Sequence, residues 1–183
     1  MIAQELLNPK SIVVVGASGD THKPGGSVLK NLINSNFKGE IYTVNPKETE
    51  VQGIKCFQKV DDLPQVDCAI IAIAAKYCPA TVNTLAFEKG TKGFIIVSAG
   101  FGEEHEQGAE FERQIVETVN KVGGSLIGPN CTGFLNRNYC GAFDSPIPTL
   151  DPHGVDFVTG SGATAVFIKE YGMTNGLTFN SVW

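Results

Sequence analysis

The strongest constraint on the fold is the alternation of short apolar runs with segments of helical spacing. The first run, residues 11–16 (SIVVVG), is rich in β-branched side chains and ends in glycine. Such a run is typical of a strand that is buried on both faces. Four further runs of this kind follow along the chain, at residues 40–44, 66–74, 93–97 and 125–128. We therefore expect five strands.

Apolar residues at helical spacing occupy the intervals between these runs. They lie at residues 28–33, at 79–86, which begin with Pro79, and at 111–122. A proline at the first turn and one apolar side are typical of amphipathic helices. Strands that alternate with helices make right-handed crossovers and a parallel sheet with helices on both faces. The sequence predicts an α/β fold with a Rossmann-like, doubly wound parallel sheet.

A change in pattern near residue 140 predicts a domain boundary. We assign residues 1–140 to the first domain and residues 141–153, which contain three prolines and no periodicity, to a linker. Residues 154–183 predict a strand at 155–158, a helix at 163–171 and a strand near 177–182. Because about 30 residues cannot bury a core of their own, we expect the truncated start of a second α/β (flavodoxin-like) domain. The chain is then a fragment of a longer protein.

The composition excludes several classes of protein. The chain has 183 residues, 14 Lys+Arg and 19 Asp+Glu, for a net charge of −5, and 42% of its residues are hydrophobic. This apolar content argues against disorder, and the acidity without a basic run argues against nucleic-acid binding. No stretch approaches the roughly 20 apolar residues that span a bilayer, and residues 1–10 do not resemble a signal peptide. We expect a cytoplasmic domain with no membrane partner.

The cysteines predict neither a disulfide framework nor a metal site. There are five of them, an odd number, and no pair has CxxC spacing. Most lie in or beside apolar runs, where packing in the core explains them. We therefore predict no metal.

The turn after the first strand is a candidate phosphate site. Gly16, Ala17 and Ser18 lie where this strand leads into the first helix, and Gly25 and Gly26 lie at the start of that helix. Small residues allow the backbone to approach a diphosphate, and a helix N-terminus favours anions. The spacing is not GxGxxG, so a tight turn without a ligand stays an alternative.

The end of the second strand indicates which nucleotide binds. A fold that binds NAD places a carboxylate there for the ribose hydroxyls, whereas this chain has Asn45, Pro46 and Lys47. A lysine suits an additional phosphate, as in NADP or at the 3′ position of coenzyme A. A solvated loop cation is the alternative, and Lys23 is a second candidate for the phosphate contact.

Five motifs in register carry a resemblance to a known family. They are Gly16-Ala17-Ser18, Gly25-Gly26 with Val28-Leu29-Lys30-Asn31-Leu32, Val44-Asn45-Pro46-Lys47, Val97-Ser98-Ala99-Gly100-Phe101 and Ile127-Gly128-Pro129-Asn130-Cys131. Together they resemble the CoA-binding domain of the NDP-forming acyl-CoA synthetases, also called ADP-forming acetate–CoA ligases. This family is related to the succinyl-CoA synthetase alpha subunit. The resemblance is clearest over residues 1–145.

The resemblance implies an enzyme, an acid–CoA ligase. Members of the family interconvert acyl-CoA, nucleoside diphosphate and phosphate with free acid, CoA and nucleoside triphosphate. The acyl group passes through an acyl phosphate, and a phosphorylated histidine carries the phosphoryl group. That histidine and the region for the nucleotide and Mg²⁺ lie outside this chain, which implies a fused or separate remainder of the ligase as partner. We therefore expect CoA binding but no catalytic residue here.

The resemblance also implies which residues line the CoA site. They match turns at the carboxyl ends of the predicted strands: Gly16, Ala17 and Ser18 at the phosphates; Asn45, Pro46 and Lys47 near the 3′-phosphate; Ile73, Ala74, Ser98, Ala99 and Gly100 along the crevice; and Asn130 and Cys131 near the thiol. Lys23, as a second candidate cation, and Gly25, as part of the glycine content that leads to the first helix, complete the set of candidate residues.

Some positions depart from the family pattern or do not match it. The family opens its second domain with Ser-Gln-Ser-Gly, but this chain has Thr159-Gly160-Ser161-Gly162, so only Ser161 and Gly162 match as a phosphate-binding helix start. His22, His105 and His153 do not match the phosphorylated histidine and are expected at the surface.

Two reactive groupings have plainer explanations. Cys131 follows a glycine-rich turn, where a helix end could lower its pKa, but we expect a structural position rather than a nucleophile. Glu103, Glu104 and Glu106 are expected to form a solvated acidic loop before a helix. Two other functions stay open: an NADP-binding oxidoreductase and a non-catalytic module that senses CoA.

Overall fold

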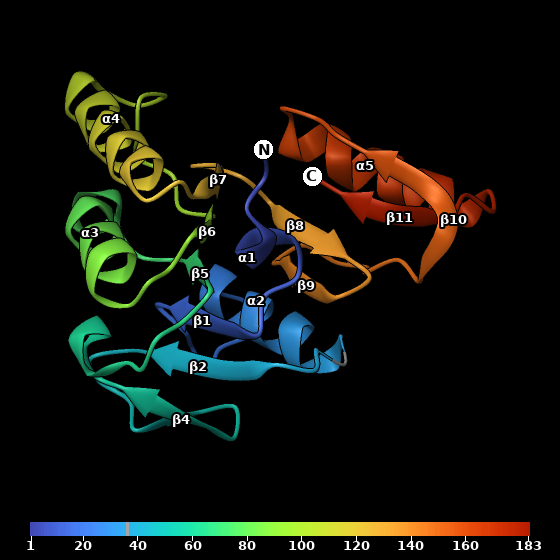
Figure 1. The fold of residues 1–183 in the computed structure, drawn as a ribbon. Helices are drawn as coiled ribbons and strands as arrows, with labels where there is room; N and C mark the ends of the chain where they lie inside the picture. Colours follow the sequence, from blue (N-terminus) through green and yellow to red (C-terminus); the bar gives the residue numbers. More distant parts are fainter. Residues whose placement is uncertain (36) are drawn as a thin grey trace.

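The computed structural model describes residues 1–35 and 37–183, and its main feature there is a seven-stranded sheet in the order β3-β4-β2-β1-β5-β6-β7 (Figure 1). All neighbours pair in parallel except β3 and β4, which are antiparallel. The strands are β1 (Ser11–Val15), β2 (Glu40–Val44), β3 (Glu50–Val51), β4 (Ile54–Phe57), β5 (Cys68–Ile71), β6 (Gly93–Ile96) and β7 (Ser125–Ile127). The predicted parallel sheet is confirmed.

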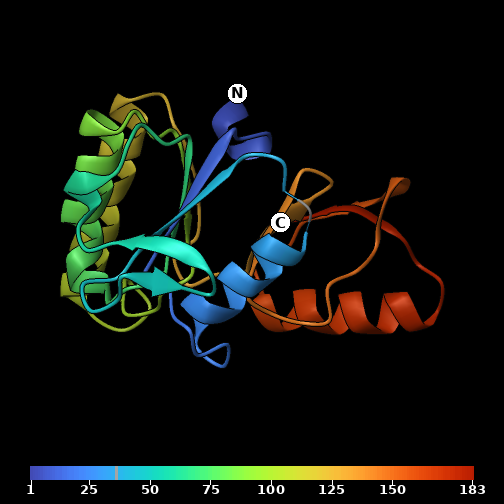
Figure 2. The same ribbon diagram turned by 90° about the horizontal axis from the view of Figure 1, so that it is seen from below.

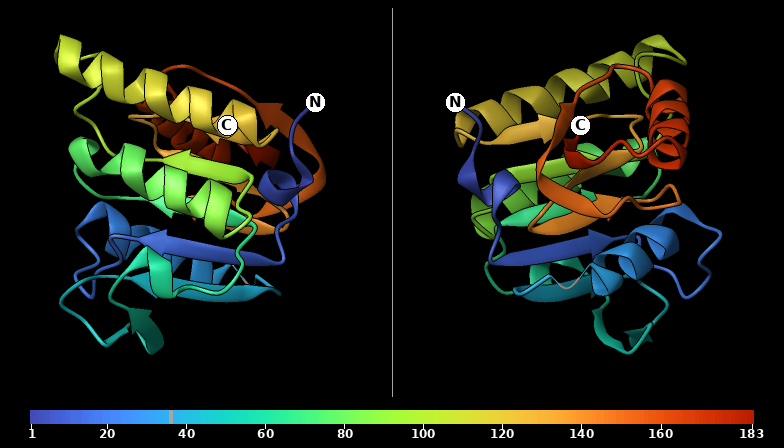
Figure 3. Two further views of the ribbon diagram at one scale, coloured as in Figure 1. Left: turned by 60° about the vertical axis from the view of Figure 1, so that its left-hand side comes forward. Right: turned by 90° about the vertical axis from the view of Figure 1, so that its right-hand side faces the viewer.

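Helices cover both faces of this sheet. Helices α3 and α4 lie against one face, and α2 lies against the other, together with the hairpin of β8 and β9 (Figures 2 and 3). The helical elements are α1 (Gln4–Leu7), α2 (Pro24–Asn34), α3 (Cys78–Glu88), α4 (Glu106–Lys121), α5 (Gly162–Thr174) and the 3₁₀ turns η1 (Val60–Asp62) and η2 (Ala75–Tyr77).

Alternation along β1 explains how the two layers are buried. Val13 belongs to the cluster that includes Leu85 of α3 and Ile115 of α4. Val14 belongs to the opposite cluster, with Leu29 of α2. Successive side chains of a strand point to opposite faces, so a strand with apolar residues throughout is buried on both sides. This is why the continuous apolar run predicted β1 correctly.

The remaining strands form a second sheet, in the order β10-β11-β8-β9. They are β8 (Gly133–Asn136), β9 (Tyr139–Ala142), β10 (Leu150–Phe157) and β11 (Phe179–Val182). β10 and β11 pair in parallel, while β11 pairs with β8 and β8 with β9 in antiparallel fashion. Helix α5 connects β10 to β11, as predicted for the end of the chain.

The expectation of an irregular linker at 141–153 is wrong in detail. β9 continues to Ala142, and β10 already begins at Leu150. Leu150 and Val155 both pair with Phe179, so β10 is interrupted between them. An edge strand accommodates proline and an irregular register because one side of its backbone needs no partner. The prolines interrupt the apolar pattern of a strand, so the sequence did not predict the first half of β10. The domain boundary itself stays a prediction.

No helix in the part of the chain that the structure describes has the length and apolar character to cross a membrane.

Candidate functional site

Five turns follow the carboxyl ends of the parallel strands, and we call them together the carboxyl edge. They are residues 16–18 after β1, 45–47 after β2, 72–75 after β5, 98–101 after β6 and 128–131 after β7. Parallel strands end on the same side of a sheet, and ligands of open α/β sheets bind there. All candidate CoA residues except Lys23 and Gly25 lie in these turns, and those two lie just after the first turn.

The first turn is held in a conformation that only glycine adopts easily. Gly16 has φ +86°, and its N–H donates to the carbonyl of Val44 over 2.9 Å. A Cβ atom added at Gly25 would lie 2.1 Å from the carbonyl oxygen of Gly16. Helix α2 therefore begins in direct backbone contact with the turn. This close approach leaves no room for a side chain at Gly25.

Asn45 and Gln52 brace the first turn from the neighbouring loops. The Asn45 side chain donates to the carbonyl of Ala17 over 2.8 Å and accepts the backbone N–H of Lys47 over 2.9 Å. Gln52 donates to the carbonyls of Ser18 and Gly26, both over 2.9 Å. Asn45 thus positions protein backbone on both sides of itself. Gln52 was missed because it lies in the β3–β4 turn, which has no sequence signal for a site.

The two candidate cations differ in their surroundings. Lys47 is exposed beside exposed Pro46, and it takes part in no ion pair within residues 1–35 and 37–183. Lys23 is also exposed, but its ammonium group lies 4.0 Å from the carboxylate of Asp20. Lys47 is therefore the better placed of the two to meet an added phosphate.

The turn after β5 joins the first turn to the turn after β6. A Cβ atom at Gly16 would lie 2.8 Å from a methyl group of Ile73, so these residues are in contact. Ala74 is exposed at the edge. Ala75 then lies 3.3 Å from the position of a Cβ at Gly100. The first, third and fourth turns of the carboxyl edge therefore form a continuous surface.

Glu103 shapes the turn after β6, where Gly100 has φ +99°. Its carboxylate accepts the backbone N–H of Gly100 over 2.9 Å and that of Phe101 over 3.1 Å. Partial desolvation acts to raise the pKa of Glu103, but these N–H donors hold the pKa below its usual range. The predicted acidic loop is exposed, as expected, and Glu103 in addition accepts hydrogen bonds from the backbone of its own turn.

We expect Glu103→Gln to lower stability more than Glu104→Gln, its matched control with an adjacent exposed acid. The amide offers one acceptor oxygen where the carboxylate offers two, and the loss is at most about 1 kcal/mol at an exposed position. Because the folded-state pKa is depressed, the contribution is present at neutral pH and is lost as the pH falls below about 4. Urea unfolding at pH 7 and pH 3.5 measures this, and equal midpoints for both variants at pH 7 contradict it.

The turn after β7 is tied to the turn after β6. The N–H of Asn130 donates to the carbonyl of Ser98 over 2.9 Å. Asn130 itself is exposed and has φ +52°, a left-handed conformation that asparagine tolerates. Ala99 is exposed beside half-buried Ser98. The last two turns of the carboxyl edge are therefore held together by the backbone.

Cys131 is not an activated thiol. Burial raises its pKa to about 11, and its Sγ donates to the carbonyl of Ile96 over 3.3 Å. A thiol in this state is protonated at neutral pH and is a poor nucleophile. The alternative of a lowered pKa is therefore wrong, and the structural position that we expected for Cys131 agrees with these contacts.

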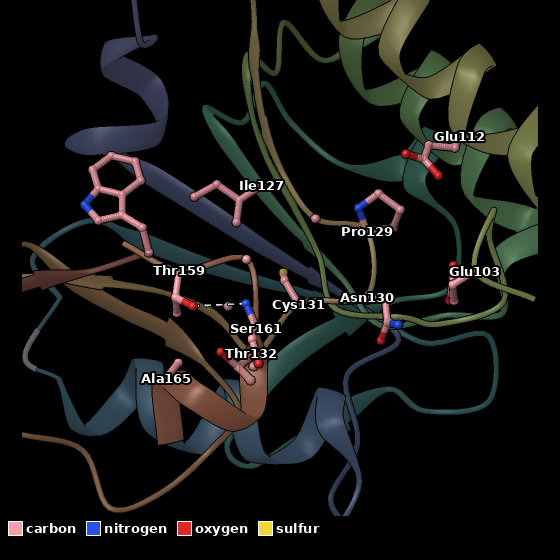
Figure 4. Close-up of a pocket in the computed structure, with 15 residues that line it drawn as sticks. Glu103, Glu112, Ile127, Pro129, Asn130, Cys131, Thr132, Thr159, Ser161 and Ala165 are labelled. Carbon is pink, nitrogen blue, oxygen red and sulfur yellow. Dashed lines mark hydrogen bonds between the residues drawn. The ribbon is translucent and has the colours of Figure 1, made fainter. Parts of the chain in front are cut away.

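A pocket of about 410 Å³ lies between the turn after β7 and the start of α5 (Figure 4). Asn130 and Cys131 of the turn after β7 line it, as do Thr159 and Ser161 before α5, and Thr132 lies against Gly162 at the start of that helix. The structure thus brings the predicted thiol-end residues and the predicted phosphate-binding helix start to one pocket. Its lining also includes Glu103 and Ile127, which the sequence analysis named without assigning them to the site, and Glu112 and Trp183, which it did not name.

Ser161 and Gly162 form a regular helix start at this pocket. Ser161 is the N-cap of α5, and its hydroxyl oxygen accepts the N–H of Thr164 over 3.3 Å. A Cβ atom at Gly162 would lie 2.9 Å from the methyl group of Thr132, so the helix start contacts the residue that directly follows the turn after β7. The first N–H groups of a helix have no partners within it and favour an anion.

The histidines and acidic side chains of the described residues form no metal-binding cluster. His22 and His153 are exposed, as expected. His105 is exposed too, and its Nδ1 caps α4 by accepting the N–H of Gly108 over 2.8 Å. The residues that the structure describes contain no group of three or more His, Cys, Asp or Glu side chains able to hold a metal ion.

A family model for the CoA-binding domain matches residues 10–137, and all five turns of the carboxyl edge lie inside the match. The chain belongs to the CoA-binding-domain family. The predicted resemblance is therefore confirmed. The match ends before β9, so this family model does not include the start of α5.

Similar proteins of this family are ADP-forming acyl–CoA ligases. Acetate–CoA ligase (ADP-forming) II of Archaeoglobus fulgidus is 46% identical over 134 residues, which are 73% of this chain and 20% of that protein. The alpha subunit of acetate–CoA ligase (ADP-forming) II of Pyrococcus furiosus is 41% identical over 158 residues, which are 85% of this chain and 34% of the subunit. The chain therefore spans only a fifth to about a third of these relatives.

A solved structure extends the similarity to the whole chain. Acetyl-coenzyme A synthetase 1 of Ca. Korarchaeum cryptofilum, a complex with phosphate and ADP, superposes with a TM-score of 0.86 at 30% identity. The superposition covers 100% of this chain and 39% of that one. The CoA-binding-domain fold with the appended β10-α5-β11 unit is thus an arrangement that the synthetase shares.

Proposed function

We propose that the chain is the CoA-binding part of an NDP-forming acyl–CoA ligase and binds CoA along the carboxyl edge. The observation that carries this proposal is the contact between successive turns, from Lys47 to the pocket at Ser161. Asn45 links the second turn to the first, Ile73 contacts Gly16, and Asn130 is bonded to Ser98. An extended ligand with anionic groups at one end suits such a surface.

The residues of the edge fit CoA by their chemistry. We assign Gly16, Ala17, Ser18 and Gly25 to the diphosphate, because glycine and small side chains let a ligand approach the backbone N–H groups. Lys47 is assigned to the 3′-phosphate, with Lys23 as a second cation, while Asn45 and Pro46 shape the loop. Ile73, Ala74, Ser98, Ala99 and Gly100 are assigned to the pantetheine, and Asn130 and Cys131 to the thiol end.

The proposed reaction interconverts acyl-CoA, NDP and phosphate with acid, CoA and NTP. CoA supplies the thiol that accepts the acyl group. In this chain, Asn130 and the protonated Cys131 line the pocket at the proposed thiol end of CoA. Ser161 and Gly162 form a helix N-terminus that can bind phosphate oxygens. The phosphohistidine and the site for the nucleotide and Mg²⁺ belong to the remainder of the ligase, as a fused domain or a partner subunit.

The two other functions have less support. Lys47 is compatible with NADP binding. The sequence, however, shows no constellation of residues for hydride transfer, which an oxidoreductase needs. A CoA-sensing module would bind in the same way without catalysis, but the relatives named above are ligases or their subunits. A cytoplasmic location is part of the proposal and is supported by cysteines that are free throughout the described residues.

Calorimetric titration with CoA, dephospho-CoA, NADPH and NADH tests the proposal. We expect CoA to bind most tightly, dephospho-CoA more weakly and the nicotinamide nucleotides least. Binding of CoA without any turnover of acid, NTP and CoA by residues 1–183 alone agrees with a division of labour with the remainder. Tighter binding of NADPH than of CoA would refute the proposal and favour the oxidoreductase.

A further inference from the structure

Lys169 of α5 is the only charged residue that is buried among those the structure describes, with 1% of its side chain exposed. Its ammonium group forms an ion pair with the carboxylate of Asp144, whose side chain is 10% exposed. An ammonium group without a partner is very costly to bury, so α5 holds this position only with Asp144 in place. The pair therefore ties α5 to the segment between β9 and β10.

Helix α2 holds the same segment from the other side. The hydroxyl of Ser27 donates to the carbonyl of Phe143 over 2.5 Å. The side-chain amide of Asn31 donates to the carbonyl of Ala142 over 2.8 Å and to that of Asp144 over 3.3 Å. Residues 142–144 are thus bonded by their backbone to α2 and by the Asp144 side chain to α5.

Both helices begin at the proposed ligand site. Helix α2 starts beside Gly16, through the close contact of Gly25 with that residue. Helix α5 starts at the pocket, with Gly162 against Thr132. A second hollow of about 460 Å³ is lined by Cys131 and Gly162 together with Asp144 itself. The segment 142–144 therefore connects two helices whose N-terminal ends lie at the proposed ligand site.

We propose that the Asp144–Lys169 ion pair positions the first turn of α5 against the turn after β7, which contains Cys131. Through residues 142–144 and α2, the pair also couples the start of α5 to residues 16–18, the turn after β1 that is proposed to bind the CoA phosphates. The coupling rests on the proposed function, while the positioning does not. Neither side chain is assigned a contact with CoA. Both are positioning residues that act through the two helices.

A set of three variants separates this role from general stability. Asp144→Asn and Lys169→Met each leave one charge buried without its counter-charge, so we expect both to unfold at lower urea concentration. The double variant removes both charges and is expected to regain part of that loss. Glu170→Gln, the neighbouring exposed acid on α5, is the control and should match the wild type.

Hydrogen exchange then reports on the position of the helix start. In the double variant without ligand, we expect amides of residues 159–165 to exchange about tenfold faster, while those of β1 stay unchanged. In the wild type, CoA should slow exchange at 159–165, and in the double variant this protection should be absent. A general loss of stability would instead speed exchange in residues 159–165 and in β1 alike.

The outcomes distinguish the two proposals. If exchange at 159–165 is the same in the unliganded double variant and the wild type, the positioning role is wrong. If CoA protects 159–165 equally in both proteins, the coupling is wrong. If calorimetry shows that the wild type does not bind CoA, the proposed function and the coupling fail together, and the comparison without ligand still decides the positioning role.

Discussion

Gly25→Ala is expected to destabilise the chain and to abolish CoA binding, although alanine is the better helix former. Gly25 lies in the first turn of α2, where helix propensity alone would favour alanine by about 1 kcal/mol. The new Cβ, however, would lie 2.1 Å from the carbonyl oxygen of Gly16 and 2.9 Å from its carbonyl carbon. Backbone atoms cannot turn aside as a flexible side chain can. Helix α2 or the first turn must move, at a cost of about 1–3 kcal/mol for overpacking.

Gly19→Ala, in the loop that precedes α2, is the matched control. A Cβ at Gly19 meets nothing within 4 Å, and the backbone there is not in the left-handed region. This variant should be neutral, or more stable by up to about 1 kcal/mol through loss of freedom in the unfolded chain. Urea unfolding and CoA titration measure both variants. Wild-type affinity in Gly25→Ala would mean that close contact between α2 and the first turn is not needed for the ligand.

The main sheet could be predicted from the sequence because its strands are buried on both faces. The run from Ser11 to Val15 contains no polar residue after the first, which a half-exposed strand would not allow. Once the parallel order is predicted, the turns after the strands must meet at one edge. The candidate residues from Gly16 to Asn130 followed from this rule and from the family motifs.

The contacts between these turns could not be predicted, because they join residues that are distant in sequence. Gln52 reaches Ser18 because β4 pairs with β2, and no pattern in the sequence predicted this pairing. Glu103 read as one acid among several, and only the fold of its turn distinguishes it from Glu104. Nothing in the sequence pattern singled out Lys169, and its burial depends on Asp144, which lies in a segment expected to be a linker.

Lys47→Ala is expected to weaken CoA binding by about 1–3 kcal/mol, or roughly 5- to 150-fold, the range for a charge-assisted hydrogen bond. The backbone of Lys47 is fixed by its bond to the Asn45 side chain, while its own side chain extends from the loop without an ion-pair partner in the described part of the chain. If the ammonium group meets the 3′-phosphate, dephospho-CoA should bind the variant and the wild type equally. Titration of both ligands against both proteins measures this difference.

Two controls separate a specific contact from a general effect of charge. Lys38→Ala removes the same charge just before β2, at the opposite end of that strand, and should leave CoA affinity unchanged. Lys23→Ala should have a smaller effect than Lys47→Ala, since Lys23 already lies 4.0 Å from a carboxylate oxygen of Asp20. The loss in Lys47→Ala should also shrink at high salt, because an exposed charge is screened. An equal loss for CoA and dephospho-CoA would assign Lys47 to the diphosphate or to the loop conformation instead of the 3′-phosphate.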